Sequence, residues 1–233
     1  MPRPRRIPST IYPAGAELRY FQALRKAIID WFTDLTTELQ AIYRQRNDAR
    51  PDEILGQIGE ELREMRNIAA RAEARLKRQQ AMSAVNASRE RWQQAEEQLM
   101  KVVGETSDIV NRLSERSIQN QIDAALTNRK LRVRTGQPMF GELQAEIDTF
   151  THNNALLIKD IGEKAAREIS YIVQNAVGND QSWESIAPLI KKRLDVTESR
   201  AALIAQNQTA RLETQLSTIR AQASGAVAFE WQR

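Results

Sequence analysis

The residue types that usually perform catalysis or hold a metal are few in this chain. Cysteine is absent and His152 is the only histidine, which removes disulfides, thiolate nucleophiles and nearly all soft-metal chemistry. The sequence also lacks glycine-rich phosphate loops, the Gly-x-Ser-x-Gly nucleophile turn and the His-Glu-x-x-His motif. We interpret His152 as a cap or surface residue and the many glutamates as members of mixed-charge helices. We therefore expect no enzymatic activity, no metal and no cofactor.

Basic side chains gather in two places. One cluster lies at the start of the chain and the other in mid-chain: Arg3, Arg5 and Arg6; Arg129, Lys130, Arg132 and Arg134. The formal net charge of +4 permits contact with polyanions without requiring it. We expect these residues to contact double-stranded DNA weakly through its phosphates, with a solvated arm and a solvated loop as the alternative.

Arg200 stands near the start of a predicted helix, where the helix dipole disfavours a cation. It is therefore expected to pair with a carboxylate such as Asp195, or to reach another element. Leu203 and Ile204 follow on the face of this helix that we expect to pack.

The composition predicts long helices that position these residues. Of 233 residues, 6% are aromatic and 27% charged, glycine and proline are few, and the mean hydropathy is -0.56. No apolar run approaches the roughly 18 residues of a membrane span, and no secretory signal begins the chain. We expect a mainly α protein, made in a cytoplasm and without a membrane partner.

The N-terminal half is predicted to contain a proline-rich basic arm at 1–13 and a long-helix region at 14–128. The first helix carries an apolar stripe, widened by Tyr20 and Trp31, that should be core. Its members are Leu18, Phe21, Ile28, Phe32, Leu35, Leu39 and Ile42.

A second helix is expected from Pro51 to about Val103. It has two heptad blocks joined by a slip near 79–83, which is typical of a coiled-coil-like arm. The blocks are Leu62, Met65, Ala69, Ala72 and Leu76, then Val85, Trp92, Ala95, Leu99 and Val102. Gly104 and Ser107 predict a restart, with a third helix ending near Asn128.

The clearest internal boundary is a basic loop at 129–141, where Gly136, Pro138 and Gly141 end regular structure. A C-terminal helical domain follows at 142–233. Its apolar residues outline one or two helices ending at Gly178, with Asn153 and Asn154 in turns or caps.

The end of the chain is predicted to form a helix, a glycine stop and a short strand. Ser182 or Ser185 opens a short helix carrying Trp183, and Thr197 caps a long helix from about 198 to 224. Gly225 ends that helix, and a strand-like tail reaches Trp231.

Several segments together resemble the phage Mu F-like minor head protein family, also called phage head morphogenesis proteins. They are Asn154 to Ile161, Gly178-x-x-x-x-Trp183, Val196-Thr-Glu-Ser-Arg200-Ala201-Ala-Leu203-Ile204-Ala205, Ala223-Ser-Gly225 and Trp231. The family commonly has Arg-Thr-Glu-Thr where this chain has Gln206-Asn207-Gln208-Thr209, and its members continue past the tryptophan. We expect a truncated, processed or partial copy.

The resemblance implies a structural virion protein bound to the portal inside the head, which supports procapsid assembly and DNA packaging or release. Its expected partners are the portal protein and, as alternatives, the major capsid or scaffolding protein, and it is expected to be oligomeric in the virion. Arg200, Leu203, Ile204, Trp183 and Trp231 are the residues expected to bind a partner. A DNA-contacting internal or ejection protein and a coiled-coil adaptor unrelated to phage are the alternatives.

Overall fold

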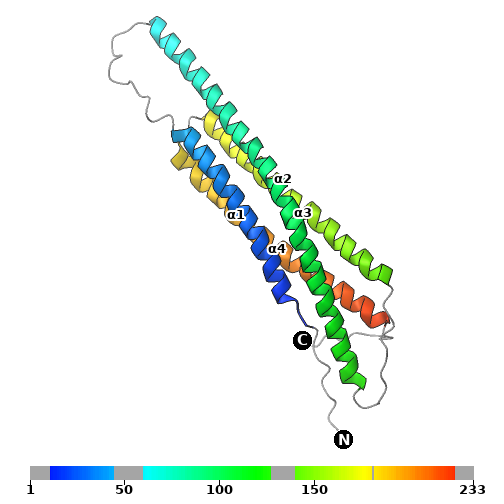
Figure 1. The fold of residues 1–233 in the computed structure, drawn as a ribbon. Helices are drawn as coiled ribbons and strands as arrows, with labels where there is room; N and C mark the ends of the chain where they lie inside the picture. Colours follow the sequence, from blue (N-terminus) through cyan, green and yellow to red (C-terminus); the bar gives the residue numbers. More distant parts are fainter. Residues whose placement is uncertain (1–10, 45–59, 127–139, 180, 224–233) are drawn as a thin grey trace. The chain divides into compact units, whose positions relative to one another are not determined.

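A computed structural model describes residues 11–44, 60–126, 140–179 and 181–223. These residues form the helices α1 (Ala14–Arg44), α2 (Glu60–Leu126), α3 (Phe140–Gly178) and α4 (Trp183–Ala223), shown in Figure 1. The predicted mainly α fold is confirmed. The strand expected after Gly225 falls outside the described residues, as do both arginine clusters.

The helices pack as two units. Unit 1 comprises Met1–Leu24, Gln98–Leu157 and Ala202–Arg233, and unit 2 comprises Arg25–Glu97 and Ile158–Ala201. Every helix contributes residues to both units. The packing units therefore do not follow the division that the sequence suggested at 129–141.

The core of unit 2 is apolar and rich in aromatic rings. On α1, buried positions recur every three or four residues from Ile28 through Trp31 and Leu35 to Leu39, so one side of the helix meets its neighbours. Trp31 lies against Trp92 of α2, with ring centroids 5.4 Å apart. Its indole nitrogen donates a 2.6 Å hydrogen bond to the carbonyl of Ser88, so the buried N–H is satisfied.

The core of unit 1 contains most of the buried polar side chains among the described residues. They come from three helices and are Thr106, Ser107, Ser114, Ser117, Asn154, Thr209, Glu213, Ser217 and Arg220. The Tyr20 hydroxyl of α1 donates a 2.5 Å hydrogen bond to Oδ1 of Asn154 on α3. Burial of such groups costs free energy unless they are hydrogen-bonded. The bond between Tyr20 and Asn154 therefore restricts how α1 and α3 fit together in unit 1.

The first turns of α1 differ from the predicted stripe. Leu18 is exposed, while Ala16, Tyr20 and Leu24 are buried. Helical spacing allows either set to face the core. Asn154 of α3 favours the observed one, because its side chain satisfies the buried tyrosine hydroxyl.

The helix restart predicted at Gly104 and Ser107 is wrong, because α2 is one helix of 67 residues. The Ser107 hydroxyl donates to the Gly104 carbonyl at 2.7 Å, so both groups are satisfied within the helix. Glycine costs a helix interior only about 1 kcal/mol relative to alanine. Burial of Val103 and Val110 on either side outweighs that cost.

The helix start predicted at Thr197 is also wrong, because α4 already begins at Trp183 and continues through it. The Thr197 hydroxyl donates to the Arg193 carbonyl at 2.8 Å instead of capping a terminus. Ser182 opens the helix, as one alternative proposed: its carbonyl accepts from the amide of Ser185 at 3.2 Å. Pro188 lies inside α4.

The turn or cap predicted for Asn153 and Asn154 is wrong as well, since both lie within α3. Asn154 is fully buried, and its amide nitrogen donates to the Phe150 carbonyl at 2.7 Å. The predicted end of this helix at Gly178 is confirmed. The amide of Gln181 bonds to the Ala176 carbonyl at 2.8 Å, a bond of the type that closes helix C-termini.

Candidate partner-binding site

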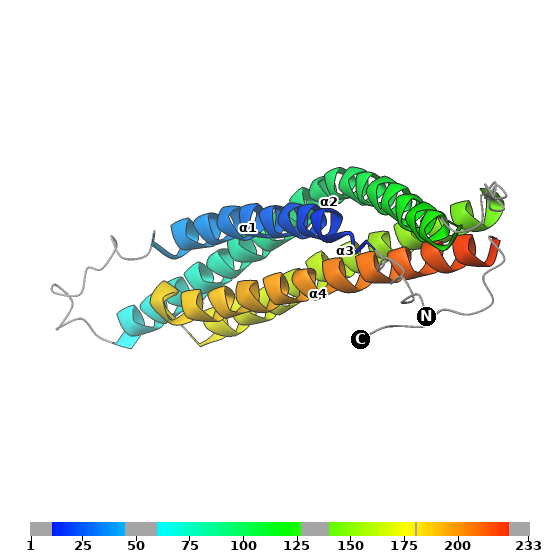
Figure 2. The ribbon, with the colours of Figure 1, turned by 90° about the horizontal axis from the view of Figure 1, so that it is seen from below.

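Within unit 2, the end of α3 and the start of α4 form an antiparallel pair, seen side by side in Figures 1 and 2. Ala176 of α3 and Ile186 of α4 are fully buried in one apolar cluster with Tyr43 of α1. Farther along the pair, Arg193 of α4 forms a salt bridge with Glu168 of α3. Apolar contact near the turn and ion pairs beyond it therefore hold these helices together.

Arg200 reaches across this pair to Asp160 of α3, with which it forms a salt bridge. It thus contacts another element, the second of the two alternatives predicted, and its partner is not Asp195. Lys164 also contacts the Asp160 carboxylate, at 3.0 Å. Desolvation raises the pKa of Asp160, but the hydrogen bonds and charges of Lys164 and Arg200 outweigh it, so the net pKa is lowered.

Leu203 and Ile204 point to different sides of α4, although they are adjacent in sequence. Ile204 is 8% exposed and belongs to the core, whereas Leu203 is 58% exposed. The expected packing role is therefore right for Ile204 and wrong for Leu203. Successive residues of a helix differ by about 100° in direction, and the buried side of α4 is centred here on Ile204 and Ala205, which turns Leu203 toward solvent.

Trp183 is half-buried and belongs to the core cluster at the start of α4. Its ring centroid lies 6.2 Å from that of Tyr43, with the rings tilted by 46°. Trp231 lies outside the described residues. Of the predicted partner-binding residues that the structure describes, Leu203 is thus the one whose side chain is mostly exposed.

No family model, curated protein or solved structure matches the chain.

Buried polar groups of unit 1 are the residues that sequence reasoning missed. The hydroxyls of Ser114 on α2 and Ser217 on α4 lie 3.0 Å apart, and the Ser217 hydroxyl donates to the Glu213 carboxylate at 2.9 Å. Desolvation raises the pKa of Glu213, and the hydrogen bond from Ser217 opposes this in part. The sequence did indicate the burial of two of them, because Ser114 and Ser117 follow Val110 at intervals of four and three residues, which places all three on one side of the helix.

A second polar contact joins the same two helices. Arg220 of α4 is buried and donates to the side-chain carbonyl of Asn111 on α2. Desolvation lowers its pKa, while the charge of Glu115 raises it. Helix pairing in unit 1 thus depends on matched polar partners, which makes it selective for one register.

The described residues contain no group of three histidine, aspartate or glutamate side chains arranged to hold a metal ion. None of the helices in the described ranges is long and apolar enough to span a membrane.

Proposed function

We propose that this chain is a structural minor head protein of a tailed phage. It associates with the portal vertex inside the capsid and supports procapsid assembly and DNA packaging or release. The proposal rests on the resemblance carried by segments of α3 and α4.

One contact between α3 and α4 gives the proposal its main structural support. Asp160 belongs to the resembling segment Asn154 to Ile161, and Arg200 belongs to the resembling segment Val196 to Ala205. The two side chains form a salt bridge between α3 and α4. The residues that resemble the family therefore include a pair that joins the two helices, as expected for segments that form one packed module.

The exposed Leu203 is the residue of this module that we assign to partner contact. A mostly exposed leucine on a rigid helix contributes to affinity when a partner covers it, by about 25 cal/mol per Å² of buried apolar surface. Ile204 supports this role indirectly, because its burial fixes which side of α4 turns Leu203 toward solvent. Arg200 and Trp183 hold α4 to its neighbours within unit 2.

The test is co-purification of the full chain with the portal protein of the same phage. The wild-type chain should bind the portal, and Leu203→Asp should weaken binding about 10-fold or more without lowering the melting temperature. Leu189→Asp is the matched control, because Leu189 is 48% exposed on α4 but lies outside the resembling segments. Absence of portal binding, or equal loss in both variants, would count against the proposal.

A further inference from the structure

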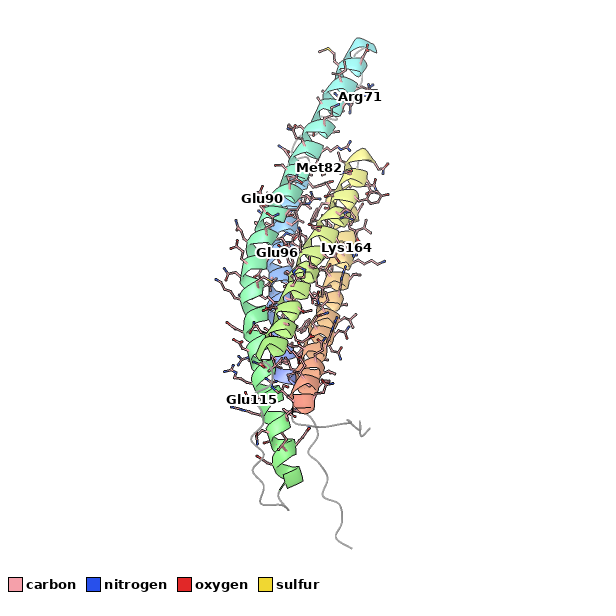
Figure 3. The ribbon with its side chains drawn as sticks, turned by 90° about the vertical axis from the view of Figure 1, so that its right-hand side faces the viewer. Arg71, Met82, Glu90, Glu96, Glu115 and Lys164 are labelled. Carbon is pink, nitrogen blue, oxygen red and sulfur yellow. The ribbon has the colours of Figure 1, made fainter. Side chains whose placement is uncertain are left out.

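The N-terminal part of α2 has an exposed face that no other described element covers. Between residues 64 and 80 every side chain is exposed except that of Lys77, which lies 4.8 Å from the ring centroid of Tyr43. From residue 64 onward, the first buried side chain of α2 is that of Ala81. Figure 3 shows this segment, marked by Arg71, extending past the end of α3 within unit 2.

This segment carries an apolar stripe with the spacing of a helix-pairing seam. Met65, Ala69, Ala72 and Leu76 follow one another in steps of four, three and four residues. Met65, Ile68 and Leu76 are each more than half exposed. From Met65 to Leu76 the stripe spans about three helical turns, a length over which a second helix can lie along it.

The charges beside the stripe are predominantly basic. Arg71 and Arg75 line one hollow together with Ile68, Ala72 and Leu76. Arg78 follows one turn farther along the same flank of α2, and all three arginine side chains are exposed. Residues 64 to 80 contain five basic and two acidic side chains, Glu64 and Glu73. A ligand that covers the apolar stripe must therefore place its own charges next to arginines.

A second copy of this chain is a poor match for that flank. In an antiparallel pair of copies the arginine flank would face itself. In a parallel pair it would face the other flank, which carries Arg66 and Glu73. The antiparallel arrangement brings like charges together, and the parallel one offers the arginines the carboxylate of Glu73 alone, which lowers the affinity.

A lipid surface is also a poorer match than a helix. Helices that lie on membranes present tryptophan, phenylalanine or leucine to the acyl chains, whereas Ala69 and Ala72 form the middle of this stripe. Small side chains at a seam allow a partner helix to approach closely. We propose that residues 64–80 of α2 dock an acidic amphipathic helix of another protein, with apolar residues in heptad spacing and carboxylates beside them.

The test uses the full chain and two synthetic helical peptides of four heptads. Both peptides have leucine at the two seam positions, and the flanking positions are glutamate in one and lysine in the other. Fluorescence anisotropy should show that the acidic peptide binds at least about 10-fold more tightly than the basic peptide. The preference should decrease as salt is added.

Two variants assign the binding to this face. In the triple variant Arg71→Glu, Arg75→Glu and Arg78→Glu, the preference should reverse so that the basic peptide binds more tightly. Leu76→Asp should weaken binding of the acidic peptide about 10-fold, whereas Leu189→Asp on α4 should leave it unchanged. All of these side chains are exposed, so the variants should keep the wild-type melting temperature.

Other occupants of the face give other results. Equal binding of the two peptides, or a preference that the triple variant leaves in place, overturns the proposal. So does Leu76-dependent dimerisation of the chain in sedimentation experiments. Tighter binding to anionic phosphatidylserine vesicles or to duplex DNA through the same arginines would assign the face to a different ligand. The proposal does not depend on the minor head function, because neither peptide derives from a portal.

Discussion

The indole ring of Trp92 on α2 occupies the space beside Gly162 of α3 where a Cβ atom would lie. An added Cβ at residue 162 would overlap the Trp92 ring at Cδ1 and Nε1. Trp92 is buried and also contacts Trp31, so the ring has little freedom to move aside. Glycine at 162 therefore allows the two helices of unit 2 to pack closely.

Gly162→Ala is expected to destabilise the protein by about 1–3 kcal/mol, because overlap in a packed core outweighs the better helix propensity of alanine. Chemical denaturation measures the change. Gly104→Ala is the matched control, since nothing lies within 4 Å of a Cβ added there. It should stabilise the protein by about 0.5–1 kcal/mol. A stabilising effect at both positions would contradict the close contact of Trp92 with α3.

Ile204→Asp is expected to unfold the part of the chain around the C-terminal half of α4, at a cost of about 4 kcal/mol or more. It places a carboxylate among buried side chains, whereas Leu203→Asp places one in solvent and should change stability by less than about 0.5 kcal/mol. Thermal unfolding followed by circular dichroism distinguishes the two. Similar melting temperatures for both variants would contradict the burial of Ile204 and the exposure of Leu203 on α4.

The sequence was sufficient to predict helices, the core stripe from Ile28 to Leu39 and the end of α3 at Gly178, since each depends on local spacing or on a glycine. It was not sufficient where a residue with two local preferences is decided by a distant partner. Thr197 and Ser107 look like helix starts because their hydroxyls can cap a terminus. They can equally bond to a carbonyl one turn earlier, and the buried residues around them select the second possibility.

The residues of the candidate site were likewise predicted only in part. That Arg200 needs a partner follows from its charge, but the choice of Asp160 requires knowing that α3 and α4 lie side by side. The side on which Leu203 lies depends on which neighbours cover α4, and the helical period does not give that. Glu213 was overlooked because glutamates on charged helices are usually exposed, whereas the burial of this one depends on helices far away in sequence.

The Asp160–Arg200 pair should contribute modestly to stability, because both side chains are more than a third exposed. A double-mutant cycle with Asp160→Asn and Arg200→Gln should give a coupling energy of about 0.5–1 kcal/mol, reduced by added salt. Lys159 and Glu163, an exposed pair on α3 with a separation of 3.8 Å, provide the comparison. Their coupling should be about 0.3 kcal/mol. A coupling near zero for Asp160 and Arg200 would contradict a role of this pair in joining the helices.

Glu213 should make the stability of the protein fall as the pH rises above its ordinary pKa of 4.5. Desolvation raises its pKa in the folded state. Between 4.5 and the raised value, the folded protein therefore holds a proton that the unfolded chain has released. The free energy of unfolding decreases across that window, by up to about 1.4 kcal/mol per pH unit for one proton. Asp160 acts in the opposite sense and in a separate window: its pKa is lowered, so its contribution is lost only as the pH falls below 3.8.

Glu213→Gln should reduce the decrease above pH 4.5, leaving the part that comes from Glu96, whose pKa is also raised by burial, and should make the protein more stable at pH 7. Its amide oxygen still accepts the hydrogen bond from Ser217, so the polar contact is kept while the buried charge is lost. Urea denaturation at half-unit steps from pH 4 to pH 8 measures the two profiles. Ser217→Ala should extend the decrease to higher pH, because it removes the hydrogen bond that lowers the pKa of Glu213. Parallel profiles for the wild type and Glu213→Gln would mean that this carboxylate is solvated in the folded protein.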